Sequence, residues 1–292
     1  MLSVLLAAAL SFTPSDAKLA YRTAREFTDV CTPRDAGTIR GQFAANFILD
    51  AASSTGADVR KDRFQAETPK GKKTFTNLIC EFSTHKDGPW VVLVSHYDTK
   101  PGVKCPGAND GASTTGLLVA LAQALGRWTT PQCNVMLLWT DGEECMEAYD
   151  EKDGFWGSKH AAERLKAEGR NVRAVICLDM LGDKNLNISL PRNTSPALRK
   201  IALYAAKKAE AADQVKEVSD LVKDDHTAFL AAGFKAVVLI DFEYGSAPGL
   251  NDYWHTEQDT IDKVSEESLL TSGKLVIEML KVLLAKPRIT NP

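Results

Sequence analysis

Uninterrupted apolar runs are the first pattern along the chain, and each is short. Apolar runs of about four to eight residues, bounded by polar or turn-forming residues, are typical of strands buried in a sheet. They predict strands at 90–96, 134–140, 173–179 and 236–241, and a short strand around Ile188. Two further extended segments, 58–66 and 75–82, flank Thr68-Pro69-Lys70-Gly71 and predict a hairpin.

Elsewhere apolar residues recur every three or four positions, the period of a helix with one buried face. This period predicts helices at 18–29, 38–53, 111–125, 157–168, 196–212, 226–232 and 265–284. Helices that alternate with strands after an opening hairpin predict one three-layer α/β/α domain. Its twisted sheet should be mixed, partly parallel and partly antiparallel, with helices on both faces.

The composition is that of an ordinary globular protein. The chain has 292 residues, of which 44% are hydrophobic and 25% charged, and its formal net charge is −3. Basic residues are scattered, so we expect no nucleic-acid partner. No segment is long and apolar enough to span a membrane. We also expect a monomer.

The N-terminal run 2–10 is apolar but far too short to cross a bilayer. It is similar to the apolar core of a secretory signal, with Ser15-Asp16-Ala17 as a candidate cleavage site, although no Lys or Arg precedes it. The alternative is an N-terminal helix packed on the domain. We favour export, to the periplasm or the exterior, with 1–17 as a signal or N-terminal segment and 18–292 as the catalytic domain.

The stretch Asp141-Gly142-Glu143-Glu144 follows the apolar run 135–139 and Thr140. Two adjacent carboxylates at the end of a buried strand are costly to keep ionised unless a cation holds them. Because neighbouring side chains at a strand end point in different directions, one carboxylate can bind a cation while the other moves protons.

Histidines and acids follow other apolar or tight-turn stretches in the same way. Together these segments supply a set of nitrogen and oxygen donors suited to Zn²⁺: His96, Asp110, Glu144, Asp179 and His255. Each residue alone has a structural explanation, such as a helix cap for Asp110 or a surface position for His255. The combination favours a metal site.

Six cysteines form no Cys-x-x-Cys pattern, so a cysteine zinc site is not expected. Cys105 and Cys145 lie close in sequence to Asp110 and Glu144, so both should belong to loops around the metal. In an exported protein these two cysteines could pair.

Five motifs resemble, in the same order, those of the zinc aminopeptidases of the M28 clan. They are Ser95-His96-Tyr97-Asp98-Thr99-Lys100, Gly107-Ala108-Asn109-Asp110-Gly111-Ala112-Ser113, Asp141-Gly142-Glu143-Glu144, Leu178-Asp179-Met180 and Trp254-His255-Thr256. Within that clan the chain is more similar to the glutaminyl-peptide cyclotransferases, or glutaminyl cyclases. These enzymes turn an N-terminal glutamine into pyroglutamate and release ammonia.

Four segments carry the resemblance to the cyclase branch: His96-Tyr97-Asp98-Thr99-Lys100, the aromatic loop 153–160, Asp224-Asp225-His226, and Trp254 before the last His. Three departures stand against it. Tyr149 lies where the animal cyclases carry a tryptophan on the pocket wall, and Ser95 lies where they carry a disulfide cysteine. The insert 241–253 is longer than theirs and is similar to that of bacterial members.

The cyclase resemblance implies one Zn²⁺ held by Asp110, Glu144 and His255, with one coordination position open for substrate. Glu143 would move the proton from the attacking amine to the leaving ammonia. Asp179 and Asp225 would share a proton or hydrogen bond and hold the leaving nitrogen. Trp254 and Tyr149 would line the pocket, and His96 would help to order the site. The substrates would be peptide or protein N-termini.

The aminopeptidase resemblance implies a different use of the same residues. His96 and Asp179 would become ligands of a second zinc, Asp110 would bridge the two ions, and Glu143 would activate water. A non-catalytic binding domain with this fold is a third alternative, but such domains usually lose the base or a ligand. Here Glu143 and every ligand are present.

Overall fold

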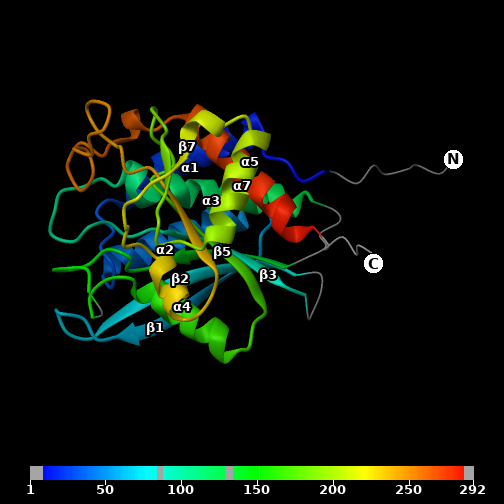
Figure 1. Cartoon of the computed structure of the whole chain (residues 1–292). Coiled ribbons are helices and arrows are strands. Elements are labelled where there is room, and N and C mark those ends of the chain that lie inside the picture. Colours follow the sequence, from blue (N-terminus) through cyan, green and yellow to red (C-terminus); the bar gives the residue numbers. More distant parts are fainter. Residues whose placement is uncertain (1–8, 84–87, 129–133, 151, 286–292) are drawn as a thin grey trace.

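The computed structural model describes residues 9–83, 88–128, 134–150 and 152–285 (Figure 1). Their centre is one eight-stranded sheet with the order β1-β2-β4-β3-β5-β8-β6-β7. The strands are β1 (Val59–Ala66), β2 (Lys73–Phe82), β3 (Trp90–His96), β4 (Asn134–Thr140), β5 (Val172–Asp179), β6 (Ile188–Leu190), β7 (Val215–Glu217) and β8 (Ala236–Ile240). The sheet is mixed, because β3 pairs in parallel with β4 and β5, whereas β2 runs antiparallel to β1 and β4. The predicted fold class and the hairpin are confirmed.

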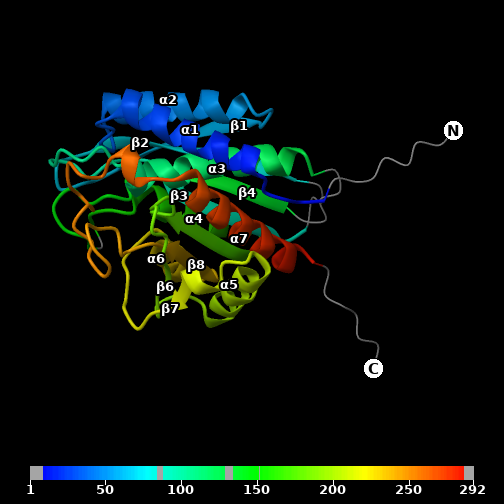
Figure 2. The same cartoon turned by 90° about the horizontal axis from the view of Figure 1, so that it is seen from above.

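Helices cover both faces of this sheet. They are α1 (Pro14–Cys31), α2 (Ile39–Ser53), α3 (Thr114–Gly126), α4 (Trp156–Ala167), α5 (Pro196–Lys208), α6 (His226–Ala231) and α7 (Glu266–Leu284). Figure 1 shows α1, α3, α5 and α7 on one side of the sheet and α4 on the other, and Figure 2 shows the sheet running from the β1 edge to the β7 edge. None of the helices in the described ranges has the length and apolar character of a membrane span.

Alternation along the central strands builds a separate core on each face. Val91 and Leu93 of β3 pack in the core that contains α1, α3, α5 and α7. Val92 and Val94 pack in the core that contains α4 and α6. Strands buried on both faces need apolar residues at every position, which explains the uninterrupted runs in the sequence.

The parallel strands β3, β4, β5 and β8 end at one edge of the sheet. His96 is the last residue of β3, and Asp179 is the last residue of β5. The stretch Asp141-Gly142-Glu143-Glu144 follows β4 directly. Open α/β sheets place their binding sites at this edge, because loops from several strands converge there.

The first helix begins earlier than its sequence pattern predicts. Thr13 caps α1, and its side chain and that of Asp16 form a reciprocal capping box. The buried Asp16 also accepts hydrogen bonds from Arg127 (2.9 and 2.8 Å) and Gln123 (3.1 Å). The boundary expected at residue 17 therefore falls inside α1 and not between structural elements. Most of the apolar run 2–10 lies outside the described residues.

The helix expected at 111–125 starts with an irregular turn instead. Residues Ala108–Ser113 form a π-type segment, and the regular α3 follows from Thr114. Asp110 and Gly111 leave helical geometry, with ψ 98° and φ 86°. A side chain at Gly111 would also approach the His96 ring to 3.1 Å. The bend that points Asp110 into the site thus requires glycine next to it.

Candidate metal centre

Two overlapping groups of ligand atoms meet at the sheet edge. The first is His96, Asp110 and Asp179, and the second is Asp110, Glu144 and His255, with ligand atoms within 4.8 Å of one another in each. Asp110 belongs to both, because its Oδ1 lies 3.1 Å from His96 Nε2 and its Oδ2 lies 3.4 Å from His255 Nε2. The structure thus brings together all five of the ligand residues that the sequence pattern singles out.

Each group is completed by a carboxylate from another strand end. His255 Nε2 lies 2.8 Å from Glu144 Oε1, and His96 Nε2 lies 3.2 Å from Asp179 Oδ1. Ligands at about 2.0–2.2 Å from one zinc ion lie within about 4 Å of each other, so both groups have the spacing of zinc ligands. The donor chemistry also fits, since imidazole nitrogen with carboxylate oxygen suits Zn²⁺.

Asp259 holds the backbone at Asp110 in place. The buried carboxylate of Asp259 accepts hydrogen bonds from the backbone N–H of Asn109 (2.7 Å) and of Asp110 (3.1 Å). It also accepts one from the hydroxyl of Tyr244 (2.8 Å). The two backbone bonds to this carboxylate fix the loop that carries Asp110 more firmly than neutral hydrogen bonds could.

Fully buried Arg34 also contacts this loop. Its guanidinium donates to the carbonyl oxygens of Tyr97 (2.6 Å), Gly107 (2.6 Å) and Asp110 (3.2 Å). Burial opposes its charge and lowers the pKa of Arg34, although the Asp259 carboxylate counteracts this effect. Arg34 therefore joins the end of β3 to the ligand loop through carbonyl groups alone.

Asp98 positions the two adjacent glutamates. One of its carboxylate oxygens accepts from the backbone N–H of Glu143 and the other from that of Glu144, both at 3.1 Å. Gly142 enters this turn at φ 78°, where an added Cβ would meet the Phe75 ring at 2.8 Å. The turn directs Glu144 into the second ligand group, whereas Glu143 belongs to neither group.

Tyr149 contacts both glutamates. Its hydroxyl donates to Glu144 Oε2 at 2.7 Å and lies 3.3 Å from Glu143 Oε2. Lys100 Nζ lies 5.0 Å from the centre of the Tyr149 ring and 3.9 Å from Glu144 Oε2. Tyr149 is therefore a hydrogen-bond donor to the carboxylates as well as a wall residue.

Trp254 precedes His255 and packs on it. The two rings stack with centroids 3.8 Å apart, and Phe242 packs on Trp254 at 5.1 Å. His255 adopts a left-handed backbone with φ 57°, which is uncommon for a residue other than glycine. Half-buried Trp254 thus covers the ligand His255 on one side.

Asp179 and Asp225 do not form the hydrogen bond that the cyclase resemblance implies. Asp179 instead contacts His96, and one oxygen of Asp225 accepts from the Thr140 hydroxyl at 2.6 Å. The other Asp225 oxygen has no hydrogen-bond partner in the described part of the chain. Asp224, which the sequence analysis did not single out as a site residue, is also buried, and its charge helps to raise the pKa of both Asp179 and Glu143.

Burial opposes charge throughout the site, and the neighbours of each group decide its protonation. Hydrogen bonds from His255 and His96 overcome burial and hold the pKa of Asp110 far below its usual range. Burial and the charge of Glu144 instead raise the pKa of Glu143 well above its usual value. Burial lowers the pKa of His255, but hydrogen bonds to Asp110 and Glu144 prevail and raise it to about 9. A bound cation would stabilise these carboxylates by replacing the histidine protons.

Comparison with protein-family models identifies the family of this chain. The model of peptidase family M28 matches residues 77–280, which include every ligand named above. The chain belongs to peptidase family M28.

Relatives of this M28 chain include several cyclases. Glutaminyl-peptide cyclotransferase of Drosophila melanogaster is 28% identical over 278 residues, covering 84% of this chain and 77% of the relative. The crystal structure of an Acidobacteriales bacterium glutaminyl cyclase is 31% identical, with a TM-score of 0.87, and covers 97% of this chain and 99% of that one. The predicted resemblance to the cyclase branch is confirmed.

The same fold occurs in a relative of the other kind. A leucine aminopeptidase precursor from Bacteroides thetaiotaomicron superposes with a TM-score of 0.80 and 24% identity, over 94% of this chain and 98% of that one. At this identity the likeness shows the fold alone. The fold is therefore compatible with both cyclase and aminopeptidase activity. Only the residues of the site can distinguish between them.

Cys105 and Cys145 of the M28 chain, which could pair in an exported protein, do not form a disulfide in the structure. Cys105 and Cys145 are both buried and free. The Cys105 thiol lies 3.8 Å from the Asp259 carboxylate, and Cys145 accepts from Lys100 Nζ, with Sγ at 2.7 Å and its carbonyl oxygen at 2.8 Å. Each cysteine thus contacts a charged group from a distant segment, and not the other thiol.

Proposed function

We propose that the chain is a zinc-dependent glutaminyl-peptide cyclotransferase that converts N-terminal glutamine into pyroglutamate and releases ammonia. The observation that carries the proposal is Glu143, a buried carboxylate beside the ligand groups that belongs to neither of them. It lies in a chain that is 31% identical, over 97% of its length, to a glutaminyl cyclase.

Asp110, Glu144 and His255 would hold the zinc ion. When bound, the ion supplies Lewis-acid polarisation of the glutamine side-chain carbonyl. Glu143 accepts the proton of the α-amine as its nitrogen attacks the side-chain carbon. The same carboxyl group then donates that proton to the nitrogen that leaves as ammonia. The raised pKa of Glu143, caused by burial and the neighbouring Glu144 charge, suits a group that must hold a proton between the two steps.

Other side chains orient the substrate. The Tyr149 hydroxyl, at 2.7 and 3.3 Å from the glutamates, keeps their carboxylates in place. Asp179 and Asp225 accept or donate hydrogen bonds at the leaving nitrogen, and Trp254 closes the pocket over the folded-back glutamine. The substrates are accordingly peptide or protein N-termini.

A di-zinc aminopeptidase is the second candidate, and one observation favours it. The two oxygens of Asp110 contact different histidines, His96 and His255, as a carboxylate that bridges two ions would. Asp179 at 3.2 Å from His96 completes the second group. In that case water activated by Glu143 attacks the peptide carbonyl and the first residue is released.

One assay pair decides between the candidates. Purified protein with added Zn²⁺ is given a Gln-peptide with ammonia release as readout, and a Leu-peptide with free leucine as readout. The cyclase proposal expects ammonia, no free leucine, and one tightly held zinc per chain by metal analysis. Two tightly held zinc ions together with leucine release overturn it in favour of the peptidase.

The variant Glu143→Gln tests the proton-transfer role. The amide keeps the size of the side chain but cannot accept the proton, so kcat should fall by roughly 10²–10⁴-fold while the zinc content stays at the wild-type value. Near-normal turnover would exclude this role for Glu143.

We also infer that the protein acts outside the cytoplasm as a monomer. Any processing would have to cut before Leu10, because Leu10 and Phe12 are buried in the core. N-terminal sequencing of protein recovered from the medium or periplasm, with gel filtration, tests both points. A mature N-terminus at residue 18 would contradict the packing of α1.

A further inference from the structure

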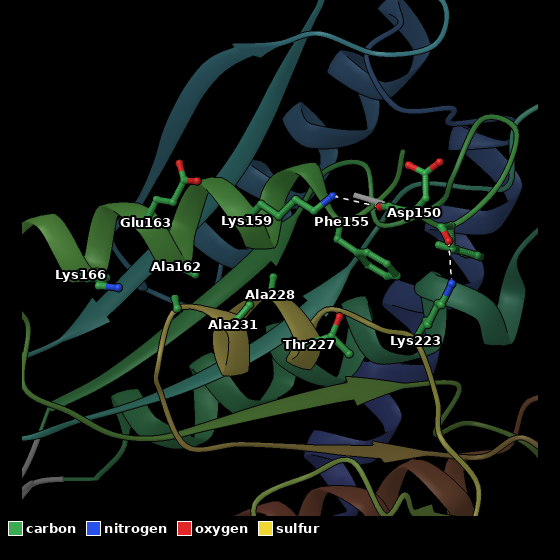
Figure 3. A pocket seen from close by; sticks show the side chains of 12 residues that line it. Asp150, Phe155, Lys159, Ala162, Glu163, Lys166, Lys223, Thr227, Ala228 and Ala231 are labelled. Carbon is green, nitrogen blue, oxygen red and sulfur yellow. Dashed lines mark hydrogen bonds between the residues drawn. The ribbon is translucent and has the colours of Figure 1, made fainter. Parts of the chain in front are cut away.

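A groove of about 630 Å³ lies between α4 and α6 (Figure 3). Ala162 of α4 faces Ala228 and Ala231 of α6 across it. At one end the rings of Tyr149 and Phe155 stack with centroids 5.1 Å apart and also line the groove. Small side chains on both helices leave an apolar floor with room for a ligand, and the volume is in the range of small-molecule and peptide sites.

The groove adjoins the candidate active site, and Tyr149 borders both. The Tyr149 ring lines the groove, whereas its hydroxyl lies 2.7 Å from Glu144 Oε2 of the second ligand group. Lys223 and Thr227 also line the groove, and they flank the buried pair Asp224 and Asp225 in sequence. The distance from the metal ligand to the groove is therefore the length of one tyrosine side chain, which two extended residues at about 3.3 Å each would span.

The charge that faces the groove is positive. Lys159, Lys166 and Lys223 line it, together with Asp150 and Glu163. Figure 3 shows the carboxylates of Asp150 and Glu163 directed away from α6, so the two acids do not close the groove.

The lysines differ in their contacts. Lys223 donates to the Tyr149 carbonyl at 2.7 Å, a neutral group, and Lys159 donates to the Gly154 carbonyl at 2.9 Å. Lys166, at the far end of the groove from Phe155, is exposed, and its side-chain ammonium has no hydrogen-bond or ion-pair partner within the described ranges. A carboxylate group of a ligand could form an ion pair with Lys166.

We infer that this groove binds the peptide segment that follows the N-terminal residue of the substrate. An apolar side chain at about the third position packs on the alanines, and an acidic side chain at about the fourth position lies near Lys166. This inference rests on the proposed function in one respect, namely that the first residue of the peptide occupies the metal centre. The peptide chain has to leave that pocket, and the groove offers an apolar, positively charged path at the distance of two residues.

The test compares peptides that differ in length and charge. The short substrate is Gln-Ala-NH₂, the long acidic one is Gln-Ala-Leu-Glu-NH₂, and the long basic one is Gln-Ala-Leu-Lys-NH₂. We expect kcat/KM of the acidic peptide to exceed that of the short peptide by about tenfold, mostly through KM, since one leucine is buried. The basic peptide should be about threefold poorer than the acidic one, as a single exposed ion pair allows.

Two variants locate the effect. Ala231→Trp fills the groove, and Lys166→Glu reverses the charge at its far end. In Ala231→Trp the ratio of kcat/KM for long and short peptides should fall towards one. In Lys166→Glu the preference for the acidic peptide should reverse. The matched control is Lys207→Glu, because Lys207 is likewise a lysine in the last turn of a helix, on α5 at the opposite face of the sheet. It should keep the wild-type ratios.

The outcomes separate this inference from the proposed function. If the short peptide is cyclised but length and charge have no effect, the groove is not a subsite and the cyclase proposal stands. If leucine peptides are hydrolysed instead, the same length series with an N-terminal leucine tests the groove. In either case, binding of the acidic peptide carrying a C-terminal fluorophore is followed by anisotropy. Equal affinity for wild-type protein and Ala231→Trp overturns the inference, whatever the reaction.

Discussion

Replacing Asp98 by asparagine should weaken metal binding without touching a metal ligand. Asp98 is fully buried, and its two oxygens accept the backbone N–H groups of Glu143 and Glu144 at 3.1 Å each. Asparagine keeps one acceptor and places an NH₂ group against the second N–H. The turn that carries the candidate ligand Glu144 and the proposed base Glu143 then loses one of its two anchors.

The size of the effect follows from these contacts. A hydrogen bond to a buried charge contributes about 1.5–3 kcal/mol, so the apo protein should lose about 2–3 kcal/mol of unfolding free energy. Residues that orient metal ligands typically alter metal affinity by about 10–100-fold when mutated. We therefore expect the zinc Kd of Asp98→Asn to rise within that range, which corresponds to about 1.4–2.8 kcal/mol.

The assay combines zinc titration with unfolding. Zinc affinity is measured by competition with a chromophoric chelator, and the unfolding free energy of the apo protein by urea. The control is Asp153→Asn, because the buried Asp153 accepts the backbone N–H groups of Met146, Glu147 and Ala148 at 2.7–2.9 Å in the same loop but contacts neither glutamate. It should lose similar stability and keep zinc affinity within about threefold. Wild-type zinc affinity in Asp98→Asn, or equal weakening in both variants, would refute the reasoning.

Two further variants test other parts of the structure. Tyr149→Phe removes the hydroxyl that contacts both glutamates. We expect kcat to fall by about tenfold with little change in melting temperature. An unchanged kcat would show that the hydroxyl has no role in turnover and that Tyr149 only lines the pocket. Asp16→Asn should lower the unfolding free energy at pH 7 by about 1–3 kcal/mol, because it removes the ionic hydrogen bonds from Arg127. Burial opposes the charge of Asp16, but hydrogen bonds from Arg127 and Thr13 hold its folded pKa below the usual 3.8. This contribution is therefore full above pH 3.8 and is lost as the pH falls through the folded pKa, so the two proteins should converge in acid, and a constant difference would contradict the assignment.

The fold could be predicted because its central strands are buried on both faces. β3, β4, β5 and β8 appear in the sequence as uninterrupted apolar runs, which few other structures require. β7 escaped prediction because it has three residues, Val215–Glu217, of which two are exposed. The irregular turn before α3 was also missed, since its composition is compatible with a helix start and only the backbone angles of Asp110 and Gly111 reveal the bend.

The candidate ligands could be predicted from the sequence because each lies at the end of a recognisable strand or in a loop beside one. The residues that position these ligands could not be predicted, since their hydrogen-bond partners are distant in sequence. Asp98 is 45 residues from Glu143, Asp259 is 149 residues from Asp110, and Arg34 is 76 residues from Asp110. A buried Asp or Arg that binds backbone groups leaves no local pattern, and only the packing of the sheet edge shows which loop it supports.

The number of metal ions is linked to the protonation of Asp179. Burial prevails over the hydrogen bond from His96 and, with the charges of Asp110 and Asp224, raises the pKa of Asp179 to about 7. A second ion at His96 needs Asp179 as an ionised ligand, so its binding must release any proton that Asp179 carries. A single ion at Asp110, Glu144 and His255 would make no such demand, and in the proposed cyclase Asp179 would be free to hold a proton beside the leaving nitrogen. We therefore expect these five candidate ligand residues to suit a cyclase if Asp179 keeps its proton and a di-zinc peptidase if a second cation displaces it.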